Sequence, residues 1–229
     1  MPRPLRLTEP GVVYHVLNRR AMRMALFRKG EEYAAFERVL AAALERADAP
    51  GLLAYCLMPN HWHLVLQAGR RTNLSSWMQW LTVTHTHRWH ARRGTAGEGP
   101  LYQGRFKSFP VQEDPHFLTV CRYVEANPLR AGLVRRAEDW MWNSLFCRQD
   151  RRAALHHLLA EWPVDRPRGW AGDVNGGLDE EDLEAVRRSV IRGAPFGSPA
   201  WQGRIAARLE LPSTLRPRGR PRKAPEKSS

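Results

Sequence analysis

The chain of 229 residues contains few cysteines and no long apolar run. Cys56, Cys121 and Cys147 are odd in number and lack Cys-x-x-Cys spacing, so they favour a reducing cytosol over a disulfide framework and cannot form a zinc knuckle by themselves. No stretch approaches the ~18 apolar residues of a membrane span, and the Pro- and Arg-rich start lacks the apolar region of a signal peptide. We therefore expect a soluble, cytoplasmic protein with no membrane partner.

Acidic residues are scarce relative to basic ones. The chain has 23 Asp and Glu against 36 Lys and Arg, which gives a formal net charge of +13 and a pI near 10.7. A well-solvated surface seldom needs so large an excess of one sign, so this balance indicates a polyanionic partner, most commonly nucleic acid. The apolar fraction of 43% is enough for a buried core, which excludes wholesale disorder.

Hydrophobic periodicity predicts a mixed architecture in the first two thirds of the chain. Alternating or continuous apolar runs predict strands, and apolar stripes with spacings of three and four predict helices. The predicted strands span residues 12–18, 52–58, 61–67 and 106–111, and the predicted helices span residues 30–47, 73–93 and 113–127. This order predicts an α+β fold in which helices cover an antiparallel sheet, the ferredoxin-like arrangement.

Composition divides the chain into four parts. Residues 1–150 form the predicted domain, and residues 151–178 are interpreted as a linker because much of this segment is rich in Pro and Gly. Residues 179–212 predict a small appendage of two short helices, which could pack as a hairpin. Residues 213–229 are rich in Arg, Pro and Gly, and we expect this basic tail to be disordered when free.

The sharpest chemical signal is the sequence His61-Trp62-His63. On a strand, alternate side chains share a face, so His61 and His63 project together and can converge on one divalent ion. A chance or structural pair is an equally common explanation for such spacing in a basic protein. His85 and His87 have the same spacing, but on a helix they point ~200° apart, which makes a poor metal site.

A second signal combines a phenol and an amide. Tyr123 and Asn127 are four residues apart, so a helix places them on one face, and Pro128 ends or loosens that helix beside them. Taken alone, this pair is more simply explained as a partly buried tyrosine followed by an asparagine near a helix end.

Three motifs together resemble the single-tyrosine HUH transposases, and more narrowly the REP-associated tyrosine transposases. They are Met-Pro-Asn-His-Trp-His at residues 58–63, Tyr-Gln-Gly-Arg-Phe-Lys-Ser at residues 102–108 and Arg-Tyr-Val-Glu-Ala-Asn-Pro-Leu-Arg-Ala-Gly at residues 122–132. The similarity covers roughly residues 10–150 in motif order and extends to the basic tail. Three motifs in order are far more specific than any one of them.

The resemblance implies an HUH nuclease fold and a DNA strand transferase. It implies that Tyr123 is the nucleophile, that it forms a 5′-phosphotyrosine intermediate, and that Mg²⁺ or Mn²⁺ is bound by His61, His63 and Asn127, where relatives often carry Gln. It further implies a single-stranded DNA partner with REP-like hairpins and a monomeric protein. Two alternatives remain: a domesticated DNA-binding or regulatory protein with little turnover, and a nuclease that uses water.

Several cations are candidate DNA contacts, although each is individually more simply a solvated charge. Arg105 and Lys107 are interleaved with Tyr102 and Phe106, a pattern typical of grooves that bind single strands by phosphate contact and stacking. In the tail, Arg-Gly-Arg-Pro resembles a minor-groove hook, and a nonspecific basic tail is an equal alternative. DNA binding implies association with the nucleoid. The other candidate cations are Arg19, Arg20, Arg23, Arg216, Arg218, Arg220, Arg222 and Lys223.

Overall fold

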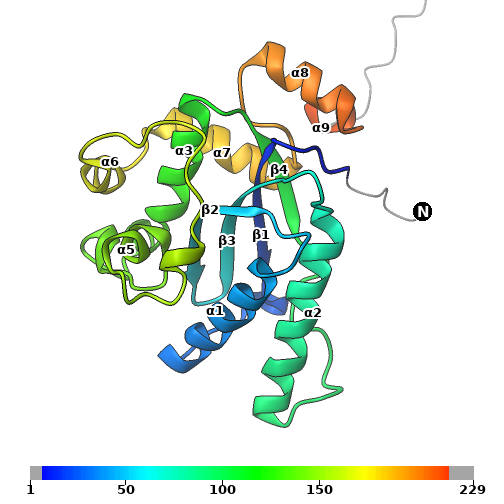
Figure 1. Ribbon diagram of the computed structural model, residues 1–229, viewed down its shortest axis with the longest axis vertical. Coiled ribbons are helices and arrows are strands. Elements are labelled where there is room, and N and C mark those ends of the chain that lie inside the picture. Colours follow the sequence, from blue (N-terminus) through cyan, green and yellow to red (C-terminus); the bar gives the residue numbers. More distant parts are fainter. Residues whose placement is uncertain (1–6, 217–229) are drawn as a thin grey trace, which may run out of the picture.

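The computed structural model describes residues 7–216, and its centre is a four-stranded antiparallel sheet (Figure 1). The strands follow the order β2-β3-β1-β4 across the sheet. Their bounds are β1 (Val13–Arg19), β2 (Gly51–Met58), β3 (His61–Gln67) and β4 (Lys107–Val111). The predicted α+β, ferredoxin-like arrangement is confirmed. No helix within residues 7–216 is long and apolar enough to cross a membrane.

Pairing between the strands fixes which side chains share a face. β2 and β3 form a tight hairpin around Pro59 and Asn60, and β3 pairs with β1 so that His63 lies opposite Leu17. Leu17 in turn lies opposite Lys107 of β4. Because side chains alternate along each strand, the two histidines of β3 face one side of the sheet and Trp62 faces the other.

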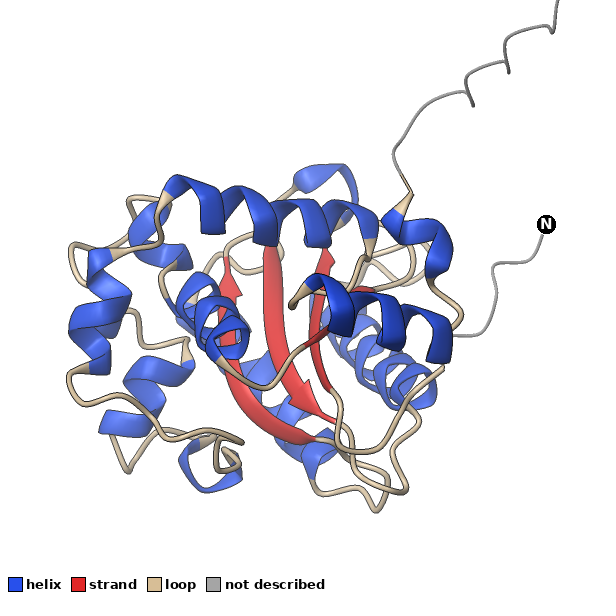
Figure 2. Ribbon diagram, turned by 90° about the horizontal axis from the view of Figure 1, so that it is seen from above, coloured by secondary structure: helices blue, strands red, loops and turns tan. Residues whose placement is uncertain are grey.

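Helices lie on both faces of the sheet (Figure 2), and one face is covered by α1 (Gly30–Leu44) and α2 (Leu74–Arg93). Asn73 caps α2, since its side chain accepts a hydrogen bond from the Ser76 backbone N–H at 3.1 Å. Trp62 is fully buried in this layer, together with apolar residues from both helices. The second helix therefore begins where the sequence predicts, with Asn73 as its N-cap residue.

The opposite face carries α3 (Pro115–Glu125), the single turn α4 (Asn127–Arg130), α6 (Trp170–Gly176) and α7 (Glu180–Arg192). Asp114 accepts a hydrogen bond from the His116 backbone N–H at 2.8 Å, which fixes the start of α3. The shorter elements are α5 (Ser144–Gln149), α8 (Pro199–Arg208), α9 (Pro212–Leu215) and the 3₁₀ turns Ala21–Arg23, Ala137–Asp139 and His156–Leu158.

The segment 151–178, expected to be a linker, is instead packed against the domain. Trp170 and Val174 of α6 are buried in the core cluster that also contains α3. The Trp170 indole N–H donates to Glu125 Oε2 at 2.6 Å. The Pro and Gly content of this segment is typical of a linker, but buried side chains and hydrogen bonds attach it to the fold, among them the Trp162 indole N–H, which donates to the Leu53 carbonyl at 2.8 Å.

The two helices of residues 179–212 do not form a hairpin, because they lie on opposite faces of the sheet. Leu183 of α7 packs in the α3 cluster, whereas Ile205 of α8 packs in the cluster of α1 and α2. Between them the chain passes the edge of β4, where the Phe196 N–H donates to the Pro110 carbonyl at 2.9 Å. The apolar stripe of each helix predicts that the helix packs against something, but it does not indicate which face of the sheet the helix covers.

The predicted basic tail lies almost wholly beyond residues 7–216. Arg216 is the last residue that the structure describes, and it is exposed. The other tail cations proposed to contact DNA lie outside the described residues: Arg218, Arg220, Arg222 and Lys223.

Candidate active site

The two histidines of β3 form the centre of the candidate site. Their ring centroids are 4.9 Å apart and their planes are nearly perpendicular, at 80°. His63 is almost fully buried, whereas His61 at the strand end is partly exposed. The strand therefore brings the two rings together on the face that α3 covers, as its alternation predicts.

Hydrogen bonds fix both rings through their Nδ1 atoms. His61 Nδ1 lies 2.5 Å from Asn60 Oδ1, and His63 Nδ1 lies 2.8 Å from the Nε2 of His15. His63 Nε2 is buried and has no hydrogen-bond partner within residues 7–216. Burial lowers the pKa of His61 to about 4 and moves the pKa of His63 in the same direction. Both imidazoles are therefore neutral near pH 7, the form that binds a metal ion.

Helix α3 brings Tyr123 against this pair. Its ring centroid lies 5.8 Å from that of His63, with the planes at 84°, and its side chain is 8% exposed. Among the described residues, no group forms a hydrogen bond with its hydroxyl. The phenol therefore lies beside the histidines, and no group within residues 7–216 holds its proton.

Arg130 connects the tyrosine to the amide. Its guanidinium carbon lies 4.4 Å from the centroid of the Tyr123 ring, and its Nη2 donates to the Tyr123 carbonyl at 3.2 Å. The same nitrogen donates to Asn127 Oδ1 at 2.6 Å. Sequence reasoning gave this arginine no role, although its spacing of seven and three from these residues placed it on the same helical face.

These residues fit a divalent cation. Because the Asn60 amide oxygen accepts at His61 Nδ1, the Nε2 of that ring is free to bind a cation. The buried His63 Nε2 has no hydrogen-bond partner within residues 7–216, so it is available as a second ligand. Asn127 Oδ1 already accepts from Arg130, but a carbonyl oxygen has a second lone pair. No group of three or more His, Cys, Asp or Glu within residues 7–216 could hold a metal. The fit therefore depends on two imidazoles and one amide.

The predicted DNA-contacting cations differ in their surroundings. Arg23, Arg105 and Lys107 are exposed, and Arg19 is partly buried. Arg20 instead donates to the Ala25 carbonyl at 2.5 Å and stacks over the Trp89 ring at 4.4 Å. Its guanidinium is therefore engaged in local packing.

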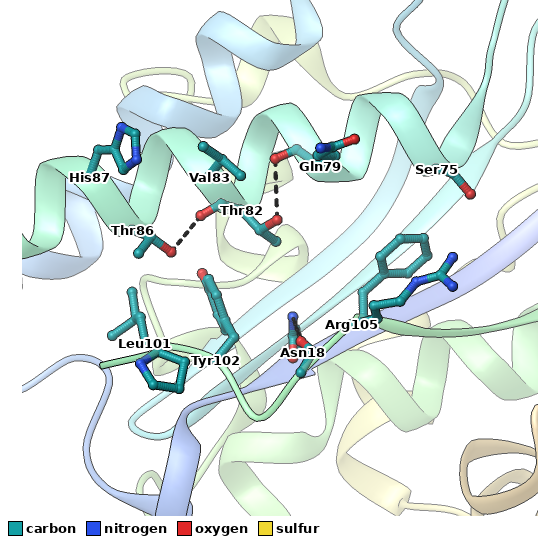
Figure 3. Close-up of a pocket in the computed structure, with 13 residues that line it drawn as sticks. Asn18, Ser75, Gln79, Thr82, Val83, Thr86, His87, Leu101, Tyr102 and Arg105 are labelled. Carbon is teal, nitrogen blue, oxygen red and sulfur yellow. Dashed lines mark hydrogen bonds between the residues drawn. The ribbon is translucent and has the colours of Figure 1, made fainter. Parts of the chain in front are cut away.

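A groove of about 710 Å³ lies on the opposite face of the sheet, between α2 and residues 100–106 (Figure 3). Arg105, Val83 and His87 line it, together with the Tyr102 and Phe106 that were expected to stack on bases. Both aromatic rings are largely buried, and the Tyr102 hydroxyl meets Trp62 Nε1 at 3.1 Å and His85 Nδ1 at 2.6 Å. Tyr102 is therefore a packing residue rather than an open stacking surface.

Comparison with known proteins identifies the family. The model of a family described as "Transposase IS200 like" matches residues 9–127, just over half of the chain. The chain belongs to the IS200-like transposase family. The resemblance carried by the three motifs is thus confirmed, and the family consists of enzymes that cleave DNA.

The fold is that of a REP-associated tyrosine transposase. A solved structure described as a REP-associated tyrosine transposase bound to a REP hairpin aligns with a TM-score of 0.54 and 20% identity. The alignment covers 74% of the present chain and 97% of the solved one. A putative transposase from Deinococcus radiodurans R1 aligns with a TM-score of 0.35 and 16% identity, covering 55% and 93%. No curated protein sequence matches the chain.

Proposed function

We propose that this transposase is a metal-dependent strand transferase that cuts single-stranded DNA beside a hairpin through Tyr123. The observation that carries this proposal is the contact between the Tyr123 ring and His63, whose buried Nε2 has no hydrogen-bond partner among the described residues. A structural core has no need for a neutral imidazole pair, a phenol and a guanidinium stacked on that phenol in one place. Support also comes from the solved neighbour, which is described as bound to a REP hairpin.

The proposed reaction is an in-line displacement at phosphorus. His61, His63 and Asn127 would hold a divalent cation, Mg²⁺ or Mn²⁺, which would supply Lewis-acid polarisation of the scissile phosphate. The Tyr123 oxygen forms a bond to phosphorus as the bond to the 3′ oxygen breaks. The phenol proton leaves to solvent and the departing 3′ oxygen takes one up. A second 3′-OH then attacks the 5′-phosphotyrosine, so that strand transfer needs no external energy source.

Among the described residues, Arg130 is a cation in direct contact with the proposed nucleophile. Its guanidinium lies against the Tyr123 ring and carries a positive charge next to the proposed nucleophile. It also holds Asn127 Oδ1, which fixes the amide one turn from the nucleophile. We assign it both electrostatic stabilisation of the attacking oxygen and positioning of the third ligand.

The DNA path follows from charge and shape. Leu17 of β1 pairs with His63 on one side and with Lys107 of β4 on the other. Lys107 is exposed, so a cation flanks the site toward the β4 edge of the sheet. Arg105 stands just beyond that edge, at the groove beside α2. A single strand leaving the site across Lys107 can therefore place unstacked bases in the groove. Arg216 and the tail beyond it add phosphate contacts in this proposal.

The deciding experiment uses a labelled single-stranded hairpin oligonucleotide, the full chain and Mn²⁺. We expect a covalent protein–DNA adduct that survives denaturation, together with a free 3′-OH on the released strand. Tyr123→Phe abolishes the adduct and the nick while hairpin binding stays nearly intact, because only the attacking oxygen is lost.

Two results support the alternatives instead. Nicking by Tyr123→Phe at a rate comparable to the wild-type chain means that water is the nucleophile and the enzyme is a hydrolytic nuclease. Hairpin binding without adduct or nick, with any supplied divalent cation, means a domesticated DNA-binding protein. A mass-spectrometric search for a nucleotide on Tyr123 separates these cases from a low yield of adduct.

A further inference from the structure

His15 lies directly behind the histidine pair and has no role in the reaction proposed above. It belongs to β1, where it lies opposite Val65 while Leu17 lies opposite His63. His15 and His63 are therefore diagonal neighbours on one face of two antiparallel strands, within reach of each other's rings. His15 is fully buried, and the two rings stack at 5.0 Å with an interplanar angle of 19°.

The bond between these two rings can exist in two forms. If His15 Nε2–H donates, His63 Nδ1 accepts and the only proton of a neutral His63 sits on Nε2, which then cannot bind a metal. If His63 Nδ1–H donates, its Nε2 keeps a lone pair for the cation. A metal-binding histidine typically donates its other N–H to an acceptor behind it. The second form is the one that the proposed site needs.

His61 shows how the neighbouring ligand solves the same problem. Its Nδ1 lies 2.5 Å from Asn60 Oδ1, and a carbonyl oxygen only accepts. The proton of His61 is thereby placed on Nδ1 and the lone pair on Nε2. His63 has no carbonyl or carboxylate at its Nδ1 within the described part of the chain, and the His15 ring occupies that place. The two ligands therefore differ in the group that sets their tautomer.

We infer that His15 is a positioning residue that accepts the Nδ1–H of His63 and holds its Nε2 lone pair toward the cation. This inference rests on the metal site of the proposed function. The buried, partnerless Nε2 of His63 is the atom that this arrangement leaves free for a ligand. His15 also meets Phe109 at 4.8 Å and Tyr123 at 6.2 Å between centroids, so its ring is fixed between strand and helix.

The test compares two buried histidines on opposite faces of the sheet. His15→Phe keeps a ring but removes the acceptor, and His85→Phe does the same where a ring nitrogen meets the Tyr102 hydroxyl. Calorimetric titration of the metal-free chain with Mn²⁺ is the readout, and DNA is absent. We expect about 10- to 100-fold weaker Mn²⁺ binding for His15→Phe and wild-type affinity for His85→Phe. His15→Gln, whose amide oxygen can accept, recovers most of the loss.

A second measurement needs no variant. In the wild-type chain labelled with ¹⁵N-histidine and loaded with Mg²⁺, the ring nitrogen shifts are expected to show a protonated Nδ1 on His63. A protonated Nε2 there overturns the inference, and so does a folded His15→Phe chain that binds Mn²⁺ like the wild type. Failure of the metal site itself has a different signature, because wild-type Mn²⁺ binding would then survive His61→Ala and His63→Ala.

Discussion

The chain carries the pattern His-x-His twice, once on a strand and once on a helix. On β3 the two rings share a face with their centroids 4.9 Å apart, and His63 has a buried nitrogen with no partner in the part of the chain that the structure describes. On α2, His85 is buried with a ring nitrogen 2.6 Å from the Tyr102 hydroxyl, while His87 is exposed at the groove. The same spacing therefore gives a convergent pair where the period is two, and two unrelated side chains where it is 3.6.

The comparison also shows what makes a buried histidine available for chemistry. His85 points its ring at a hydroxyl inside an apolar layer, so its polar atom is used by the fold. His63 is equally buried, yet its Nε2 is left over after His15 has satisfied Nδ1. An unused polar atom in a packed core is costly, and a ligand offsets that cost.

The largest expected effect comes from removing either histidine of the β3 pair. His61→Ala and His63→Ala each reduce the covalent adduct and Mn²⁺ binding below detection, because the cation loses one of two imidazole ligands. His85→Ala and His87→Ala leave Mn²⁺ affinity unchanged. Titration of all four variants with Mn²⁺, with circular dichroism to confirm folding, decides between the pairs. Unchanged affinity after loss of either strand histidine rules out the site.

The next effect concerns two arginines stacked on aromatic rings at the same distance. Arg130 and Arg20 each hold their guanidinium carbon 4.4 Å from a ring centroid, over Tyr123 and Trp89 respectively. Arg130→Gln is expected to slow adduct formation about 100-fold at saturating DNA, because it removes the cation stacked on the ring of the proposed nucleophile. Arg20→Gln leaves that rate within about threefold. Single-turnover rates measure both, and equal losses would mean that Arg130 acts only through packing.

Local periodicity was enough to predict the strand that carries the site. The predicted bounds of β3, residues 61–67, agree with the structure, and α2 is capped by Asn73, the first residue of its predicted range, 73–93. The face shared by the β3 histidines follows from alternation along one strand, which needs no knowledge of the rest of the chain. The α+β architecture was predicted on the same local grounds.

Features that depend on distant pairing could not be predicted. His15 meets His63 only because β1 and β3 pair in one register, and nothing near either residue in the sequence states that register. Trp170 reaches Glu125 from a segment whose Pro and Gly content is typical of a linker. Arg130 is different, because its spacing of seven residues from Tyr123 can be read in the sequence and is compatible with the contact that the structure shows.

A smaller effect concerns pH, and here the two faces are expected to behave alike. Burial lowers the pKa of both His15 and His85 from 6.5 to about 3. The unfolded chain therefore binds these protons more tightly, and the stability that each neutral ring contributes is present above pH 6.5 and lost as the pH falls toward 3. Each ring accounts for at most about 1.4 kcal/mol of unfolding free energy per pH unit in that window.

Replacing either ring isolates its contribution to acid lability. In urea unfolding between pH 6.5 and 4, His15→Phe and His85→Phe are both expected to reduce the slope of unfolding free energy against pH by about one proton. Only His15→Phe is expected to change Mn²⁺ affinity. A wild-type slope in either variant shows that the ring is protonated without cost in the folded chain.

The smallest expected effect belongs to the exposed member of the helical pair. His87 lines the groove, and in the proposed path it lies beside unstacked bases of the substrate strand. Stacking on one base contributes about 1–3 kcal/mol for a well-placed aromatic ring, and a rim imidazole achieves a fraction of that. In a Tyr123→Phe background that cannot cut, His87→Ala is therefore expected to weaken binding of the hairpin oligonucleotide about threefold by fluorescence anisotropy. His157→Ala, which removes an exposed histidine that does not line the groove, is the matched control and leaves affinity unchanged. Equal affinities for the two variants would remove the groove from the DNA path and confine binding to the strand face and the cations around it.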